Sequence, residues 1–189
     1  GVIAFPTDTV YGIGGLACSP DAIREIYRIK GRSFDKPLPV MVADIGQLGL
    51  VAVDIPPAAR HLADSFWPGA LTIVLPKQPG LPPGLPPLAT VGVRIPAHPF
   101  TLALLRTCGP LAVTSANLSG QPEALSVDEV RQQLGPDLGL IVDGGRSPGG
   151  MASTVVDLSG REPRILRAGP ISEESIRRAL AGEHLAREG

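Results

Sequence analysis

The sequence predicts a single α/β domain, in which helices pack on one mixed, twisted β-sheet. Its 189 residues are near the usual size of one domain and are enough to bury a core without disulfides. Short apolar runs alternate with amphipathic segments, an order typical of helices packed on a largely buried sheet. The 23 glycines and 21 prolines mostly fall between these runs, where loops are expected. We therefore expect one domain over residues 1–189, with a concave ligand site at strand ends.

The N-terminal part has the clearest local signals. Residues 2–5 form an apolar run that Pro6 ends, which predicts a buried strand. Residues 19–21, Ser-Pro-Asp, combine a capping hydroxyl, a proline suited to the first helical position and an early acid, so a helix should begin there. Gly31 is a natural end for that helix. Since the chain starts at Gly1 and enters an apolar run at once, we expect a short N-terminal segment of the domain to be missing.

The remaining elements follow the same alternation. Apolar and β-branched runs predict strands at 39–43, 71–75, 91–95, 111–114, 140–143, 153–158 and 164–167. Amphipathic patterns predict helices at 57–66, 98–107, 126–134 and 172–181. Residues 76–87 contain six prolines and are expected to form an extended, proline-rich loop.

Composition argues against several classes of protein. With 17 Lys+Arg against 18 Asp+Glu, the net charge of −1 does not favour a broad basic surface for nucleic acid. Seven aromatic residues are too few for the stacking platforms of a general single-strand binder. No apolar run approaches the roughly 18 residues of a membrane span, and the start lacks a signal-peptide pattern, so we expect a soluble, cytoplasmic protein.

The cysteines and lysines exclude two familiar kinds of site. Cys18 and Cys108 have no partner at metal-ligand spacing, so we expect reduced core thiols and no zinc site. Lys30, Lys36 and Lys77 are the only lysines and none follows a glycine, which excludes a Walker A phosphate loop. Any nucleotide would need a different cradle.

Residues 12–17, Gly-x-Gly-x-x-Ala, look like a dinucleotide-binding fingerprint. The helix start at Ser19 lies after this motif, whereas a Rossmann turn needs its helix to begin inside it. We therefore set that interpretation aside.

A local basic cluster marks the end of the first predicted helix. Its members are Arg24, Arg28, Lys30, Arg32 and Lys36. One interpretation is a solvated helix end whose cations complement the helix dipole. The other is a phosphate clamp, in which arginine offers a planar fork of donors and lysine a compact charge. The cluster alone does not decide between them.

Two polar turns and one arginine add candidates for a ligand site. Residues 6–9 and 114–117 each follow a predicted strand, and their hydroxyl and amide groups suit either local turn bonding or a ligand at strand ends. Arg94 lies within the alternating strand 91–95, so it should leave a half-buried strand and need an anionic partner. That partner is either an internal acid or the carboxylate of a ligand.

Eight short motifs follow one another over roughly residues 2 to 180. They are F-P-T-D-T-V-Y-G-I-G (5–14), K-G-R-S-F-D-K-P-L (30–38), F-W-P-G-A-L-T (66–72), V-R-I-P-A-H-P (93–99), T-S-A-N-L-S-G (114–120), D-G-G (143–145), S-T-V-V-D (153–157) and I-L-R-A-G (165–169). Together they resemble the YrdC family of threonylcarbamoyl-AMP synthases, and their order and spacing carry the resemblance more than any one motif.

The resemblance implies a nucleotidyltransferase. Members of the family make threonylcarbamoyl-AMP and pyrophosphate from L-threonine, bicarbonate and ATP, with Mg²⁺ held mainly by the phosphates and no metal ligand from the protein. The product feeds threonylcarbamoyladenosine modification of tRNA, which a separate transferase complex completes. Direct RNA binding is then expected to be weak or absent, and no membrane is involved.

The same resemblance assigns roles to individual residues. The expected catalytic residues are Lys30, Arg32, Ser115 and Asn117. The expected ATP-binding residues are Arg32, Lys36, Thr90, Ser115 and Arg167. The expected threonine-binding residues are Thr9, Arg94, Val113 through its backbone, and Ser153. At Met41 many members carry His, and at Glu123 a small hydroxyl residue, so those two contacts are not carried over.

Two alternative functions remain open. One is the carbamoyl-adenylate chemistry of hydrogenase maturation, in which a related domain sits in a larger protein with cysteine clusters. The other is a non-catalytic RNA-binding or ribosome-associated paralogue. The short length, the absence of cysteine clusters and the near-neutral charge argue against both.

Overall fold

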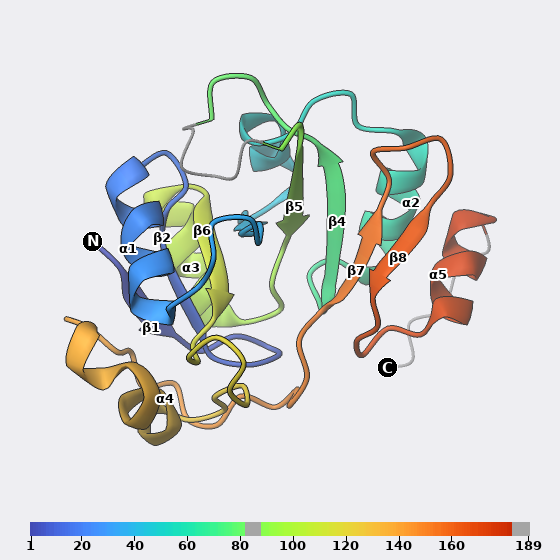
Figure 1. Cartoon of the computed structure of the whole chain (residues 1–189). Coiled ribbons are helices and arrows are strands. Elements are labelled where there is room, and N and C mark those ends of the chain that lie inside the picture. Colours follow the sequence, from blue (N-terminus) through green and yellow to red (C-terminus); the bar gives the residue numbers. More distant parts are fainter. Residues whose placement is uncertain (82–87, 183–189) are drawn as a thin grey trace.

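One mixed β-sheet organises the computed structural model, which describes residues 1–81 and 88–182. Within these residues the sheet has eight strands in the order β1-β2-β6-β3-β5-β4-β7-β8 (Figure 1). The strands are β1 (Ile3–Phe5), β2 (Gly12–Leu16), β3 (Val40–Met41), β4 (Leu71–Pro76), β5 (Thr90–Arg94), β6 (Leu111–Ser115), β7 (Thr154–Asp157) and β8 (Arg164–Arg167). The pairs β3–β5 and β4–β7 are parallel and the others antiparallel, so the predicted single domain with a mixed sheet is confirmed.

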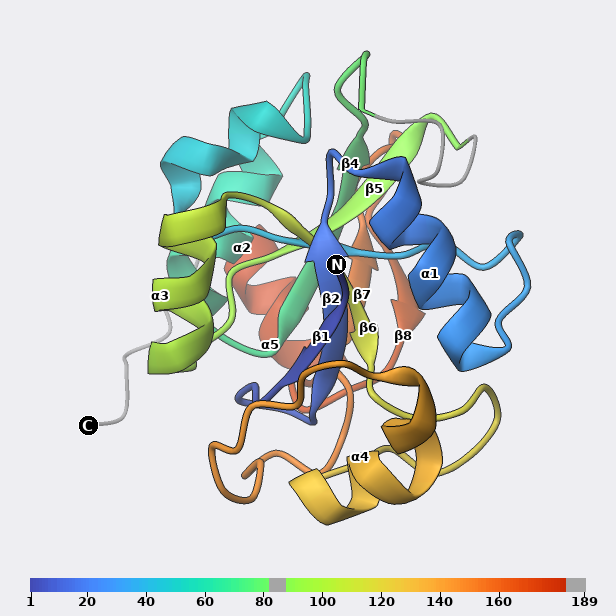
Figure 2. The ribbon, with the colours of Figure 1, turned by 90° about the vertical axis from the view of Figure 1, so that its left-hand side faces the viewer.

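In the described part of the chain five α-helices lie where the sequence places them. They are α1 (Pro20–Lys30), α2 (Pro57–Phe66), α3 (Pro99–Cys108), α4 (Val127–Leu134) and α5 (Glu173–Leu180), with 3₁₀ turns at Ile45–Leu50 and Gly135–Asp137. The start and end signals of α1 are confirmed: the Ser19 side chain accepts from the Ala22 N–H, and Gly31 takes the left-handed φ of 55°. Figure 2 shows α1 and α3 on opposite sides of the β1–β2 pair.

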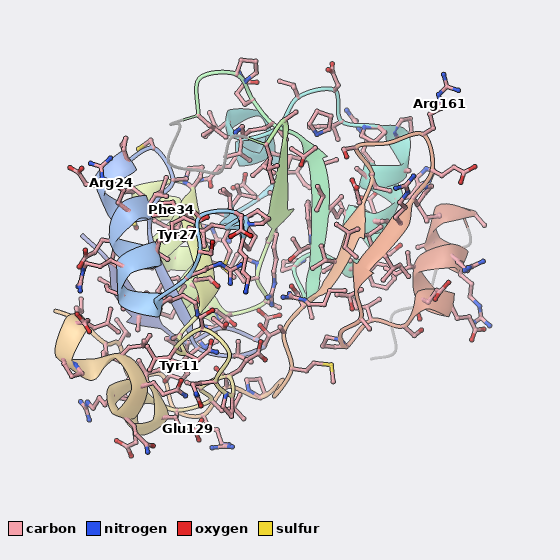
Figure 3. The ribbon with its side chains drawn as sticks, viewed as in Figure 1. Tyr11, Arg24, Tyr27, Phe34, Glu129 and Arg161 are labelled. Atoms are coloured by element: carbon pink, nitrogen blue, oxygen red, sulfur yellow. The ribbon has the colours of Figure 1, made fainter. Side chains whose placement is uncertain are left out.

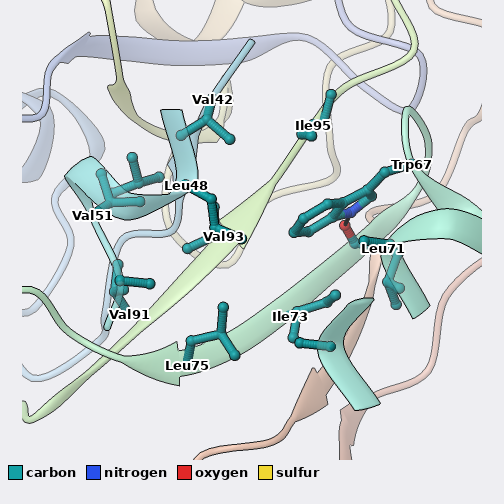
Figure 4. Close-up of a cluster of buried hydrophobic side chains, with 14 of the residues drawn as sticks. Val42, Leu48, Val51, Trp67, Leu71, Ile73, Leu75, Val91, Val93 and Ile95 are labelled. Atoms are coloured by element: carbon teal, nitrogen blue, oxygen red, sulfur yellow. Dashed lines mark hydrogen bonds between the residues drawn. The ribbon is translucent and has the colours of Figure 1, made fainter. Parts of the chain in front are cut away.

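The largest apolar cluster covers one face of the sheet. Alternate residues of neighbouring strands point into it, among them Ile73 and Leu75 of β4 and Val91 and Val93 of β5 (Figure 4). Helices α1, α2 and α5 pack against this face, through residues such as Ile26, Leu62 and Ile176. Because successive side chains of a strand point to opposite faces, the intervening residues of β4 and β5 face the other side of the sheet.

Strand β2 is absent from our predictions, and its glycines explain why. The sequence Gly-Ile-Gly-Gly-Leu has little intrinsic preference for a strand. In the structure β2 packs so closely on β6 that a Cβ at Gly14 would lie 2.9 Å from the Ala112 carbonyl oxygen and 3.2 Å from the Phe5 ring. The close packing of β2 against its neighbours therefore requires glycine at this position, although glycine by itself disfavours a strand.

Two other predictions were wrong. Residues 140–143 do not form a strand: Ile141 makes only an isolated bridge to Ala4, because β1 has just three residues to pair with. Cys18 and Cys108 are both exposed, since they lie at the ends of elements and not on the inward faces, so neither is a core thiol. Residues 82–87 of the expected proline-rich loop lie outside the described residues. No helix in residues 1–81 or 88–182 is long and apolar enough to cross a membrane.

A buried lysine joins the end of α1 to the turn after β6. Lys30 is only 2% exposed, and its Nζ donates to the carbonyl oxygens of Ser115 (2.5 Å) and Asn117 (2.6 Å) and to Oδ1 of Asn117 (3.2 Å). The Lys30 carbonyl in turn accepts from the Ser119 N–H at 3.0 Å. The three donors of one ammonium are thus matched by three oxygens, and this pairing offsets the cost of burying the charge.

Burial of Lys30 predicts a pH-dependent contribution to stability. Burial lowers the pKa of the ammonium from 10.5 to about 8. Between these values the unfolded chain binds more protons than the folded one, so the contribution of Lys30 to the free energy of unfolding rises with pH. The difference in this free energy between wild type and Lys30→Met should therefore grow in favour of wild type from about pH 8 to about pH 10.5.

Urea unfolding at a series of pH values would measure this difference. Lys36→Met, which replaces an exposed lysine six residues further on, is the matched control. A wild-type advantage that stays constant or shrinks over the window would contradict the prediction.

Candidate functional site

A cavity of about 410 Å³ lies on the face of the sheet opposite the main core. Much of its floor consists of alternate residues from adjacent strands. These are Val113 and Ser115 of β6, Met41 of β3, Thr90, Gly92 and Arg94 of β5, Thr72 and Val74 of β4, and Val155 and Asp157 of β7. The cavity therefore extends across the sheet face and is not confined to strand ends. Its volume is within the range of small-molecule sites.

Three arginines give the cavity its charge. Arg32, Arg94 and Arg167 all line it, and burial lowers the pKa of each guanidinium. Glu123 and Asp157 are acids in the same lining. In the described residues Arg32 and Arg167 hydrogen-bond only to carbonyl and hydroxyl oxygens, so these two cations favour a ligand with negative charge.

Arg94 has an internal acid as partner, as one of our two interpretations required. Its side chain is 5% exposed, and its Nη2 donates to Oδ1 of Asp8 at 2.7 Å. Nη1 donates to Oγ1 of Thr9 at 3.0 Å, and Nε donates to the Gly69 carbonyl at 2.9 Å. A guanidinium has five N–H donors, so two remain beyond these three bonds. Arg94 can thus keep its internal partners and still bind a carboxylate in the cavity.

Arg167 and Ser153 form the next part of the wall. Arg167 donates from Nε and Nη2 to the Ser153 carbonyl, at 3.0 and 2.8 Å, and from Nη2 to the Ser153 hydroxyl at 3.1 Å. Ser153 directly precedes β7 and is 4% exposed. The predicted nucleotide residue Arg167 and the predicted threonine residue Ser153 are therefore in direct contact.

Arg32 lies on the segment that follows α1. Its Nε donates to the Lys36 carbonyl at 3.4 Å and its Nη2 to the Pro37 carbonyl at 3.2 Å. The Tyr27 hydroxyl donates to the same Lys36 carbonyl at 2.8 Å, and the Tyr27 and Phe34 rings stack 4.4 Å apart beside α1 (Figure 3). The basic cluster thus divides: Arg24 and Arg28 pair with surface acids, whereas Arg32 reaches the cavity.

The structure brings most of the predicted site residues together. Those that line the cavity are Arg32, Thr90, Arg94, Val113, Ser115, Ser153 and Arg167. Those that lie elsewhere are Thr9, Lys30, Lys36 and Asn117. Thr9 accepts a hydrogen bond from Arg94, and Asn117 accepts one from Lys30, but neither Thr9 nor Asn117 lines the cavity. Lys36 is exposed. Their functional roles stay predictions.

Several lining residues were not predicted. Thr72, Val74 and Asp157 could have been found from strand alternation, since each lies two residues from another position on the same face. Tyr11 has no such signal, because it precedes the unpredicted strand β2. Met41 and Glu123, where the sequence departs from the family pattern, both line the cavity. No cluster of three or more His, Cys, Asp or Glu placed to bind a metal occurs in the described part of the chain.

Comparisons with known proteins agree on one family. The model of the Sua5/YciO/YrdC family, described as telomere recombination, matches residues 1–169. The threonylcarbamoyl-AMP synthase of Bacillus subtilis is 44% identical over an alignment of 187 residues, and the match covers 97% of this chain and 54% of that protein.

Solved structures share the fold. Pyrococcus abyssi Sua5 complexed with L-threonine has a TM-score of 0.91 and 41% identity, and the match covers 97% of this chain and 54% of that one. Escherichia coli YciO has a TM-score of 0.82 and 28% identity, over 93% of this chain and 86% of that one. This chain thus spans about half the length of the Bacillus and Pyrococcus relatives. With a family model that covers most of its length, an arginine-lined cavity and a shared fold, the chain belongs to the Sua5/YciO/YrdC family.

Proposed function

We propose that this chain forms threonylcarbamoyl-AMP and pyrophosphate from L-threonine, bicarbonate and ATP. The observation that carries the proposal is Arg94, whose guanidinium lines the cavity with two N–H donors beyond its internal bonds. A carboxylate matches that fork in bidentate geometry. The names of the relatives support threonine as the carboxylate, because one is a threonylcarbamoyl-AMP synthase and another was crystallised with L-threonine.

The amino-acid end of the proposed site is built around Arg94. Ser153 would donate to the substrate beside it, and Thr9 would fix the guanidinium through the bond that it accepts from Nη1. The Val113 N–H already donates to the Pro39 carbonyl at 2.9 Å, so the Val113 carbonyl is the backbone group that we assign to the amine. The apolar atoms of Val113 and Met41 would exclude water from the carbamate, which water destroys.

The nucleotide end is assigned to Arg32, Arg167, Thr90 and Ser115, with Lys36 entering from the exposed segment. We assign Lys30 a positioning role in place of the expected catalytic role beside the phosphates. With its three donors spent on Ser115 and Asn117, it would position the Ser115 backbone and would not contact phosphate. The same assignment makes Asn117 a partner of Lys30 and a support of the turn.

The proposed reaction has two steps that need positioning more than a protein nucleophile. The threonine amine attacks the carbon derived from bicarbonate, and a carbamate forms with loss of water. A carbamate oxygen then attacks the α-phosphorus, and the bond to the leaving pyrophosphate breaks. Arg32 and Arg167 would stabilise the charge that develops on the phosphates. Mg²⁺ would add charge neutralisation, held mainly by the phosphates of the nucleotide.

We further propose that the product serves threonylcarbamoyladenosine modification of tRNA through a separate transferase complex, in the cytoplasm. Direct RNA binding is not part of the proposal, because the arginines that define the site line a cavity and the net charge is −1. Carbamoyl-adenylate chemistry of hydrogenase maturation is not favoured either, since the Bacillus relative carries the threonylcarbamoyl name.

Radiolabelled threonine, bicarbonate, ATP and Mg²⁺ incubated with the purified chain would test the proposal. We expect labelled threonylcarbamoyl-AMP and an equal amount of pyrophosphate, both dependent on threonine and bicarbonate. Pyrophosphate release that ignores threonine, or no adenylate product, would refute it.

Arg32→Ala should weaken ATP binding about tenfold to a hundredfold, because charge-assisted hydrogen bonds to phosphate are lost. Calorimetric titration of ATP measures the effect. Arg24→Ala is the matched control, since Arg24 belongs to the same basic cluster but is exposed and paired with Asp21. Equal ATP affinity in wild type and Arg32→Ala would show that Arg32 does not bind phosphate and would favour the interpretation of the cluster as a solvated helix end.

Arg94→Ala should abolish threonine-dependent pyrophosphate release while ATP still binds, because the carboxylate loses its partner. We expect a loss of several orders of magnitude in kcat/KM for threonine, since the variant also leaves the partly buried Asp8 without its cation. Arg94→Lys should restore only part of the activity, because an ammonium keeps the charge and not the planar fork. If Arg94→Ala impairs ATP and threonine binding equally in a folded protein, the threonine site lies elsewhere.

A further inference from the structure

A pair of buried hydroxyls forms part of the cavity wall where β4 and β7 lie side by side. Thr72 of β4 is 3% exposed and Ser153, just before β7, is 4% exposed. Their Oγ atoms are 2.8 Å apart, and both residues line the cavity. Thr72 has no role in the function proposed above.

Arg167 fixes the direction of one hydrogen bond of this pair. Its Nη2 donates to the Ser153 Oγ at 3.1 Å, and arginine has no acceptor, so the Ser153 oxygen must use a lone pair for this bond. Either hydroxyl can donate to the other, because a hydroxyl has one proton and two lone pairs.

The two hydroxyls carry two protons, and one bond between them uses one. In either orientation a single O–H remains without an acceptor among the described residues, and both residues that can carry it line the cavity. A buried donor without a partner costs free energy, which a ligand acceptor would recover. The pair is therefore built to donate one hydrogen bond.

The surroundings favour an anionic acceptor. Arg167 lies close enough to Arg94 for its charge to lower the pKa of the Arg94 guanidinium further. The hydroxyl pair thus lies beside Arg167, which donates to Ser153 and has no acid among its described hydrogen-bond partners. A carboxylate or carbamate oxygen fits this position, and an ammonium does not.

We propose that Thr72 is a positioning residue for the amino-acid substrate: it holds the Ser153 hydroxyl so that the pair donates one hydrogen bond to an anionic oxygen of threonine or its carbamate. This inference rests on the proposed function. Thr72 would act from β4, whose opposite face is packed in the main core, so its position is rigid.

Thr72→Val removes the hydroxyl and keeps the shape of the side chain, whereas Thr72→Ser keeps the hydroxyl and removes the methyl group. Together they distinguish the effect of the hydroxyl from the effect of the shape. Thr72→Val should raise the KM for threonine about three- to tenfold, the loss expected of one neutral hydrogen bond, and change the KM for ATP less than about twofold. Thr72→Ser should return the threonine KM to within about twofold of wild type. Titration of threonine into protein saturated with a non-hydrolysable ATP analogue should show the same order of affinities.

Thr101→Val is the matched control for lost stability. Thr101 is equally buried and its hydroxyl donates to the Pro6 carbonyl at 2.6 Å, but it does not line the cavity. Both valine variants should lower the melting temperature, and only Thr72→Val should change the threonine KM. If Thr72→Val does not fold, Thr72→Ala compared with Thr72→Ser tests the same hydroxyl.

Three outcomes would overturn the inference: an unchanged threonine KM in Thr72→Val, an equal change for ATP, or no rescue by Thr72→Ser. A wild-type chain that makes no threonylcarbamoyl-AMP would refute the proposed function instead, and the inference with it. The wild-type assay thus distinguishes the two failures.

Discussion

The buried ammonium of Lys30 is the interaction on which the geometry of the site depends. It ends α1, and it holds the carbonyl oxygens of Ser115 and Asn117, so one charge fixes the last residue of β6 and the turn that follows. Arg32 lies two residues after Lys30, on the segment that follows α1. Displacement of Lys30 would leave two carbonyl groups without donors inside the protein and would move Arg32 relative to Ser115. A residue that looks like part of a phosphate clamp therefore acts as the joint between two walls of the cavity.

The sheet serves the core and the site with opposite faces of the same strands. In β4 and β5, Ile73, Leu75, Val91 and Val93 pack in the main cluster, and the residues between them line the cavity. A one-residue slip of either strand would exchange these sets and bury arginine in the apolar core. The register that secures hydrophobic burial thus also places Thr72 and Arg94, so stability and site geometry are not independent properties of this fold.

Local chemistry predicted much of the fold, and long-range packing decided the rest. The capping signals of α1 and the alternation around Arg94 are encoded within a few residues, and both were read correctly. Strand β2 was not, because its glycines are explained only by the close approach of β6 and Phe5. For the site, the family resemblance identified seven residues of the cavity wall, whereas the burial of Lys30 depends on carbonyl groups some 85 positions away in sequence. No local pattern reports such a partner.

The hydrogen bonds of Arg32 to the Lys36 and Pro37 carbonyls bear on how an anion would be captured. These two bonds use one N–H of Nε and one of Nη2, so three of the five guanidinium donors remain, two on Nη1 and one on Nη2. Arg32 can therefore keep both carbonyl partners while it binds an anion. A guanidinium that folding has already oriented loses less rotamer freedom when the anion arrives, so part of the ordering cost of binding is borne by the folded segment and not by the ligand.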